Sequence, residues 1–170
     1  MLELRGAPAL SPFRCEKLFG QLTEAVQGVS GIYAEFMHFV DAEAELGDSE
    51  QEILDRLLTY GPSTETQQPD GVLFLVVPRP GTVSPWSSKA TDIARNCGLR
   101  QVNRIERGIA YYVKAEQKLG REERQSIAAL LHDRMTETVF HEMAGAELLF
   151  HREEPRPLER IPVLSGGRPA

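Results

Sequence analysis

The strongest constraint on the fold is an internal repeat, because one part of the sequence matches another part 73 residues further along. An ungapped comparison of residues 2–58 with residues 75–131 gives 13 identities over 57 positions. Chance at average composition would give roughly three or four. The matched pairs include Leu2 with Leu75, Ser11 with Ser84, Pro12 with Pro85, Val29 with Val102 and Val40 with Val113. A repeat of this kind predicts two similar halves related by a pseudo-two-fold axis.

Each half has the pattern of strand, helix, strand and helix. In the first half we expect a short strand at 2–4, a helix capped at Ser11-Pro12, a strand at 29–41, and a helix at 48–58 with Asp48 as its cap. In the second half we expect a strand at 72–77, a helix capped at Ser84-Pro85 and ended by Gly98, a strand at 102–113, and a helix at 120–135. A further helix is predicted from there to about Phe150. The sequence therefore predicts an internally duplicated α+β fold, in which each half buries its sheet face or its helices against the other.

Two polar segments divide the chain. Residues 61–71 have proline and glycine near both ends and predict a linker. Residues 151–170 are rich in charge, proline and glycine and predict a second linker. The first repeat then covers residues 1–60, and the second repeat, with the extra helix, covers residues 72–150. The last segment has no closing element, which indicates that it leads toward a domain missing from this chain.

The apolar stripes of the helices predict which side chains enter the core. The Ser-Pro-aromatic motif begins one helix in each half, and it predicts a cap followed by an aromatic core anchor, either Phe13 or Trp86. The stripe that begins at Trp86 continues through Ala90, Ile93, Ala94 and Cys97. Cys15 lies on the matching stripe of the first half. Both cysteines are therefore expected to be buried thiols, with a disulfide as the alternative.

The charge and hydropathy of the chain exclude several functions. The 170 residues carry a net charge of −6, whereas binding to nucleic acids or membrane surfaces through overall charge needs a basic excess. There is no apolar run of about 18 residues, and the first residues lack the pattern of a secretory signal. We therefore expect neither nucleic acid nor membrane as a partner, and a cytoplasmic location.

The stretch from Arg79 to Lys89, RPGTVSPWSSK, is the main candidate for a binding site. A helix N-terminus offers unpaired N–H groups and the positive end of the helix dipole, which suit a phosphate. The alternative is an ordinary helix start, in which Ser84 caps, Trp86 packs in the core, and the Ser-Ser-Lys segment faces water. The first repeat keeps Ser-Pro-aromatic without Ser-Ser-Lys, so the second repeat is the better candidate for a loop that faces a ligand or an active site. The candidate side chains are Arg79, Thr82, Ser84, Ser87, Ser88 and Lys89.

Other reactive side chains do not form a recognisable catalytic or metal-binding set. His141-Glu142 begins a zinc-binding HExxH pattern, but Gly145 stands where the second histidine would be. His38 lies in a predicted strand and is expected to be a core histidine. The alternating charges of residues 104–107 predict a solvated strand face with weak ion pairs, and Gly108 predicts a bulge or a close backbone approach. An independent small enzyme is therefore the weakest hypothesis.

The segment PRPGTVSPWSSKATDIARNCGLRQVNRIERGIAYYV resembles the N-terminal region of the large, single-chain phosphoribosylformylglycinamidine synthase family of purine biosynthesis. The segments LRGAPALSPFR, IYAEFMHFVD, LLTYGP and HDRMTETVF fit the same region in order, so the resemblance covers nearly the whole chain. Enzymes of this family use ATP, magnesium and glutamine to convert formylglycinamide ribonucleotide to formylglycinamidine ribonucleotide. Their N-terminal domain is similar to a dimer of the small subunit of the multi-subunit form, which agrees with the repeat found here.

The resemblance implies a non-catalytic domain that docks on the synthetase domain of a longer parent chain and helps to complete the ammonia path from its glutaminase domain. The ATP site, the metal ligands and the glutaminase nucleophile would lie in those later domains. The resemblance thus assigns no catalytic residue, metal or cofactor to this chain, which alone is expected to be inactive. The Arg79 to Lys89 loop would face the synthetase active centre, and would contact the substrate phosphate or the domain interface. The competing hypothesis is a stand-alone duplicated α+β binding or scaffold module that uses this loop as an anion pocket.

Overall fold

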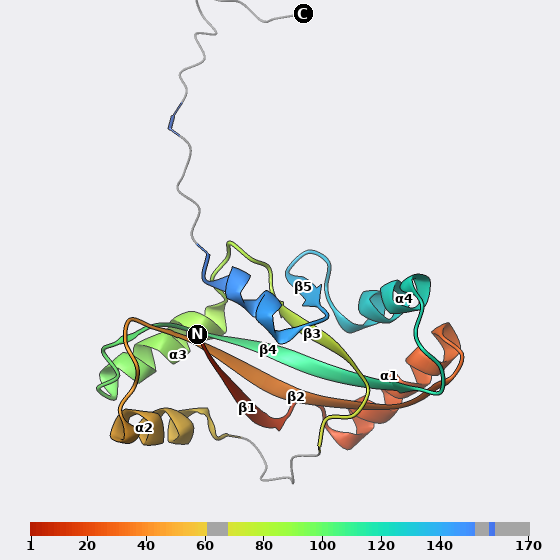
Figure 1. The fold of residues 1–170 in the computed structure, drawn as a ribbon, viewed down its shortest axis with the longest axis horizontal. Coiled ribbons are helices and arrows are strands. Elements are labelled where there is room, and N and C mark those ends of the chain that lie inside the picture. Colours follow the sequence, from red (N-terminus) through yellow and green to blue (C-terminus); the bar gives the residue numbers. More distant parts are fainter. Residues whose placement is uncertain (61–67, 152–156, 159–170) are drawn as a thin grey trace, which may run out of the picture.

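A computed structural model describes residues 1–60, 68–151 and 157–158 of the chain (Figure 1). These residues form one antiparallel sheet in the strand order β1-β2-β4-β3-β5, together with four α-helices and one 3-10 helix. The predicted α+β class is confirmed. The elements are β1 (Leu2–Pro8), α1 (Pro12–Ala25), β2 (Val29–Ala42), α2 (Asp48–Leu58), β3 (Val72–Pro78), α3 (Pro85–Asn96), β4 (Val102–Ala115), α4 (Arg121–Leu131), β5 (Glu137–Phe140) and the 3-10 helix η1 (Met143–Leu149).

The four α-helices cover one face of the sheet, and η1 covers part of the other. Successive side chains of a strand point to opposite faces. On β2, Ala34 and Val40 belong to the clusters packed against the α-helices, while Met37 and Phe39 belong to the cluster beneath η1. Helices α1 and α4 pack over one end of the helical face, and α2 and α3 pack over the other (Figure 1). The central strands β2 and β4 are therefore covered on both faces.

Strands β2 and β4 pair along their whole lengths. Each has 14 residues, and Val29 lies opposite Ala115 while Ala42 lies opposite Val102. Near the middle of both strands, Phe36 lies opposite the residue 73 positions after it in the sequence, Ile109. The bounds of α2 and α4 differ by the same offset.

The first strand of each half does not follow this offset. Leu2 lies opposite Val40 and Val72 lies opposite Val113, so Val72 takes the place in the sheet that corresponds to Leu2. The ungapped match of Leu2 with Leu75 is therefore wrong. Three residues separate β1 from α1, whereas six residues, 79–84, separate β3 from α3. The additional residues lie in this second connection, which we call the β3–α3 loop.

The helix boundaries are mostly those that the sequence predicts. Ser11 caps α1, and Gly98, with a φ of 98°, follows the end of α3 in the left-handed conformation that favours glycine. The predicted cap of α2 is wrong, because Asp48 is the first helical residue. The preceding Gly47 donates its N–H to the Glu50 carboxylate at 2.9 Å, which satisfies a donor at this helix start.

The region after α4 differs most from the prediction. Helix α4 ends at Leu131 instead of Met135, because the Asp133 carboxylate accepts the Met135 N–H at 2.8 Å in a local turn that competes with the helix. The predicted helix from there to about residue 150 is wrong: β5 pairs with β3, and η1 follows. A Cβ on Gly145 would lie 2.5 Å from the ring of Phe140, so glycine lets η1 lie directly on β5.

Several side chains predicted to be buried are exposed. Phe13 is 73% exposed and is not a core anchor, whereas Trp86 is partly buried against the cluster beneath α2 and α3. Ile93 and Cys97 are also exposed, and Cys15 is only partly buried. Both cysteines are free thiols, and burial raises the pKa of Cys15. The buried residues of α3 are Ser87, Thr91 and Ala94.

The buried face of α3 differs from the predicted apolar stripe. Strand β3 pairs with β4 only from Val113 to Ile109, which leaves the backbone of earlier β4 residues without a partner from β3. Earlier in β4, α3 side chains satisfy the strand backbone instead. The Thr91 hydroxyl accepts the Ile105 N–H at 3.0 Å, and Arg95 donates to the carbonyl of Val102 at 3.2 Å. A polar face of α3 therefore packs inward.

Most of the two predicted linkers, at residues 61–67, 152–156 and 159–170, lies outside the described residues. Among the described helices, none is long and apolar enough to cross a membrane.

Candidate functional site

The β3–α3 loop is shaped by hydrogen bonds within itself. Gly81 has a φ of 83°, a conformation that favours glycine. Thr82 donates its N–H and its hydroxyl to the carbonyl oxygen of Arg79, at 3.2 Å and 2.6 Å. At the start of α3, the Ser84 Oγ accepts the Ser87 N–H at 3.0 Å, as the cap prediction requires.

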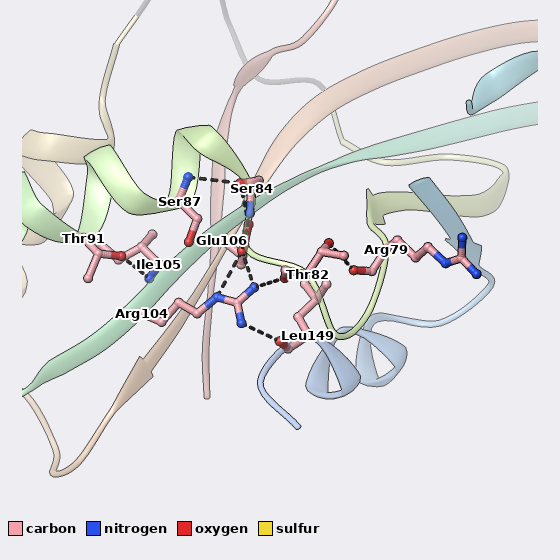
Figure 2. A network of polar contacts seen from close by, with 9 residues as sticks. All are labelled: Arg79, Thr82, Ser84, Ser87, Thr91, Arg104, Ile105, Glu106 and Leu149. Atoms are coloured by element: carbon pink, nitrogen blue, oxygen red, sulfur yellow. Dashed lines mark hydrogen bonds and ion pairs between the residues drawn. The ribbon is translucent and has the colours of Figure 1, made fainter. Parts of the chain in front are cut away.

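A buried carboxylate from β4 lies at the start of α3 (Figure 2). Glu106 has no solvent exposure. It accepts the Ser84 N–H at 3.3 Å and the Ser84 hydroxyl at 2.9 Å, so this hydroxyl both donates to Glu106 and accepts from Ser87. The helix dipole favours a negative charge at this end of a helix. Glu106 thus supplies from within the chain the charge that a bound phosphate would bring.

Arg104 binds this carboxylate and joins it to two other segments (Figure 2). Its Nε donates to Glu106 at 3.0 Å, and its Nη2 forms an ion pair with the same oxygen. Nη2 also donates to the Thr82 carbonyl at 2.6 Å, and Nη1 donates to the Leu149 carbonyl at 3.0 Å. The guanidinium of Arg104, whose side chain is only 16% exposed, therefore connects β4, the β3–α3 loop and the end of η1.

The prediction of a solvated strand face at residues 104–107 is wrong. Both faces of β4 are covered by other elements. Its alternating side chains therefore point into the core under the α-helices on one face and the core under η1 on the other, and neither set faces solvent. The close backbone approach predicted at Gly108 is confirmed, because a Cβ there would lie 2.8 Å from the carbonyl oxygen of Val76. The pairing of β4 with β2 is continuous at this position, so Gly108 is not a bulge.

The predicted site residues divide into two groups. Thr82 and Ser84 are engaged in the bonds described above. Ser87 is fully buried, and its hydroxyl has no hydrogen-bond partner within the described part of the chain. In Figure 2 the side chain of Arg79 points away from Glu106. Thr82 is exposed as well as engaged, and Arg79, Ser88 and Lys89 are the other exposed members.

An apolar groove lies beside the loop. It has a volume of about 390 Å³, and its lining includes Val83, Pro85 and Met135. Val83 and Met135 are largely exposed. Exposed apolar side chains at a groove suit contact with another protein surface better than they suit a phosphate.

His38 is a core histidine, as predicted. It is fully buried, and its Nε2 lies 2.7 Å from the Tyr60 hydroxyl. Burial, and then the positive charge of Arg107, lower its pKa to about 4, against a smaller opposing effect of the Leu4 backbone. Among the described residues, no group of three or more histidine, cysteine or acidic side chains could hold a metal ion.

The comparison with protein families decides the relationship. A family model described as the formylglycinamide ribonucleotide amidotransferase N-terminal region matches residues 35–150. The chain belongs to this family. The match runs from β2 to the end of η1 and includes the β3–α3 loop and both members of the Arg104–Glu106 pair. It confirms the resemblance seen in the sequence and connects the chain with the amidotransferase step of purine biosynthesis.

The sequence did not point to the two residues that organise the β3–α3 loop of this amidotransferase N-terminal region. Arg104 and Glu106 lie on β4, and Glu106 is separated from its partner Ser84 by 22 positions. The available signal was the charge alternation of residues 104–107 inside a long predicted strand, which the structure places at the centre of the sheet. A central strand covered on both sides must pair or hydrogen-bond its charges.

Proposed function

We propose that this chain is the non-catalytic N-terminal domain of a formylglycinamide ribonucleotide amidotransferase, and that it docks on the synthetase domain of a longer parent chain. The observation that carries the proposal is the family match over residues 35–150, which takes in the whole helical face of the domain beyond α1. The parent would be an ATP- and glutamine-dependent carbon–nitrogen ligase of the cytoplasm. Its synthetase and glutaminase domains would be the partners of this domain, which would support ammonia transfer between them.

We infer that the domain arose by duplication of a strand-helix-strand-helix unit. The support is the 13 sequence identities, together with the common offset of β2 and β4 and of α2 and α4. The mutual pairing of β2 and β4 is what a two-fold arrangement of two such units would give. Residues 1–60 and 72–150 would then be the two repeats, with residues 61–71 and 151–170 as linkers.

The β3–α3 loop is the part of the domain that we place toward the synthetase active centre. It is longer than its counterpart in the first half, and it is held in one shape by Arg104 and Glu106. Its exposed side chains would meet the substrate phosphate or the neighbouring domain, whereas its engaged hydroxyls would serve the fold. Because Glu106 already uses the donors of Ser84, the loop is poorly suited to the alternative of a stand-alone phosphate-binding module.

We expect the ATP and magnesium of the parent reaction to bind in domains other than this one. Among the described residues, no group of acidic or histidine side chains could hold a metal ion. The N-terminus of α3, the candidate phosphate site, is already bonded to Glu106 through Ser84. No catalytic step is therefore assigned to this chain.

The test is kinetic and uses the full-length parent enzyme. A triple variant, Arg79→Ala with Ser88→Ala and Lys89→Ala, removes exposed groups without touching the buried network. A matched variant, Lys118→Ala with Arg121→Ala, removes exposed cations elsewhere on the domain. Activity is measured with glutamine and, separately, with ammonia as the nitrogen donor.

A loop that contacts substrate predicts a higher KM for the ribonucleotide with either nitrogen donor. A loop that serves only the domain interface predicts lower glutamine-dependent turnover with ammonia-dependent turnover retained. If the triple variant and its matched control both behave like the wild type in both assays, the loop does not face the active centre.

A further inference from the structure

Arg107 occupies an unusual environment at the centre of the helical face. Its guanidinium carbon lies 4.5 Å from the ring centroid of Phe36 and 4.7 Å from that of Trp86. A third ring, that of Tyr60, lies at 6.0 Å. These distances are within the range of favourable cation–π contacts. The rings hold the planar guanidinium in a fixed position before any ligand arrives.

A hydrogen-bond relay fixes the same group at one edge. Arg107 Nη1 donates to the Tyr60 hydroxyl at 3.1 Å, and this hydroxyl lies 2.7 Å from Nε2 of His38. A neutral imidazole can accept at Nε2, so the Tyr60 hydroxyl donates to His38 while accepting from Arg107. This relay uses one of the five N–H groups of the guanidinium.

Arg5 and Arg104 each bind a buried carboxylate, whereas no carboxylate pairs with Arg107 in the described part of the chain. Arg5 binds Glu35 through two bonds of 2.8 Å, and Arg104 binds Glu106. Arg107 is partly buried, and within the described part of the chain it makes one hydrogen bond, to Tyr60. A charge withdrawn from water without a counter-ion is costly, and it sits here in a chain whose net charge is −6.

We propose that Arg107 is the receptor for an external oxyanion, a carboxylate or phosphate group that binds two of its free N–H groups. Arginine presents a fixed fork that matches two oxygens of either group, and a fork held between aromatic rings loses little freedom on binding. The site is separate from the exposed groups of the β3–α3 loop and does not depend on the proposed function. It identifies α3 as the element whose Trp86 would sense the bound anion.

The sequence provides a direct probe, because Trp86 is the single tryptophan of the chain. The 170-residue chain is titrated with sodium phosphate, sodium acetate or sodium chloride at constant ionic strength, and Trp86 fluorescence is recorded. The Nε–Hε resonance of Arg107 is followed in parallel by NMR on ¹⁵N-labelled protein. We expect a saturable change of both signals with phosphate or acetate that chloride does not reproduce. The two oxyanions distinguish a phosphate ligand from a carboxylate ligand.

Two variants locate the response. Arg107→Lys keeps the charge but lacks the fork, and we expect binding weaker by about tenfold, as for the loss of one charge-assisted hydrogen bond. Arg121→Met removes an exposed cation at the start of α4 and should bind as the wild type does. The wild-type NMR titration needs no variant, so a folding defect cannot hide the result.

The proposal is overturned if neither oxyanion shifts the Arg107 resonance beyond the effect of chloride. It is also overturned if Arg107→Lys binds the oxyanion as tightly as the wild type does. Neither outcome bears on the kinetic test of the parent enzyme, so the two proposals can fail independently.

Discussion

Replacing Glu106 with glutamine isolates the charge that holds the β3–α3 loop. The side chain keeps its size, but the carboxylate that accepts from Ser84 and pairs with Arg104 is lost. The amide NH2 group of glutamine then replaces one carboxylate oxygen and faces the N–H and O–H donors of Arg104 and Ser84. Removing one partner of a buried ion pair typically costs about 3–5 kcal/mol, because the other charge stays behind without compensation.

The surroundings of Arg104 place the expected cost at the lower end of this range. Its guanidinium keeps the bonds to the carbonyls of Thr82 and Leu149, and its side chain has 16% exposure for partial hydration. We therefore expect Glu106→Gln to lower the free energy of unfolding by about 3 kcal/mol. A domain of ordinary stability, about 5–15 kcal/mol, would remain folded and measurable.

Glu35 provides a matched control, since it is also fully buried and also paired with an arginine. Its partner Arg5 is 41% exposed and can regain water when the charge is removed. Glu35→Gln should therefore cost only about 1–2 kcal/mol. The difference between the two variants tests whether the exposure of the arginine, and not the burial of the carboxylate, sets the energy.

The assay is urea unfolding followed by circular dichroism, with the variants Glu106→Gln, Arg104→Met and the double variant in one thermodynamic cycle. We expect the double variant to be more stable than the sum of the single effects implies, by about 1–3 kcal/mol. Additive effects would refute the argument. So would a Glu106→Gln variant that is no less stable than Glu35→Gln.

Three further predictions concern other parts of the domain. The pKa of His38 is lowered to about 4 from its ordinary value of 6.5. As the pH falls, this histidine is therefore protonated in the unfolded chain before it is protonated in the folded chain. The free energy of unfolding should be highest above pH 6.5 and should decline by about 3 kcal/mol down to pH 4. His38→Gln should flatten this part of the urea-stability profile, and an equal slope in both proteins would contradict the assignment. Gly108→Ala should destabilise by about 1–3 kcal/mol through backbone crowding, whereas Gly31→Ala, where a Cβ meets only the Lys114 side chain at 3.6 Å or more, should not. Thermal melts should show that Phe13→Ala is nearly neutral and that Trp86→Ala costs about 3 kcal/mol, in contrast to the equal roles that the motif suggests.

The elements around the centre of the sheet were predictable because their signals are local and repeated. The long β-branched strands beginning at Val29 and Val102, and the caps at Ser11 and Ser84, use patterns that act within a few residues. The region after α4 was not predictable in this way. A single carboxylate, that of Asp133, redirects the chain, and β5 forms only because the edge of β3 is available to pair with it.

The sequence singles out the β3–α3 loop as a candidate site, and this stays a prediction, but it does not reveal the carboxylate at the start of α3. Serines and cations in front of a helix indicate a site for an anion. The pattern is the same whether that anion is an external phosphate or a carboxylate of the same chain. To decide between an external and an internal anion, one must know that the side chain of Glu106 points to the loop. This depends on which face of β4 each residue occupies, and on both faces being packed against other elements. The same reasoning explains why Arg107, on the opposite face of the same strand, was not recognised as unpaired.

The comparison of the two halves gives a physical reason for the Arg104–Glu106 pair. The residues 73 positions before them are Gly31 and Tyr33, which cannot supply a guanidinium or a carboxylate. The first half needs neither, because its connection from β1 to α1 has only three residues. The β3–α3 loop is twice as long, and its added backbone groups need partners once they are removed from water. Arg104 donates a hydrogen bond to the carbonyl of Thr82, and Glu106 accepts one from the N–H of Ser84. The internal anchor is therefore needed only by the longer loop, and a variant that shortens the loop to three residues should tolerate the loss of both charges.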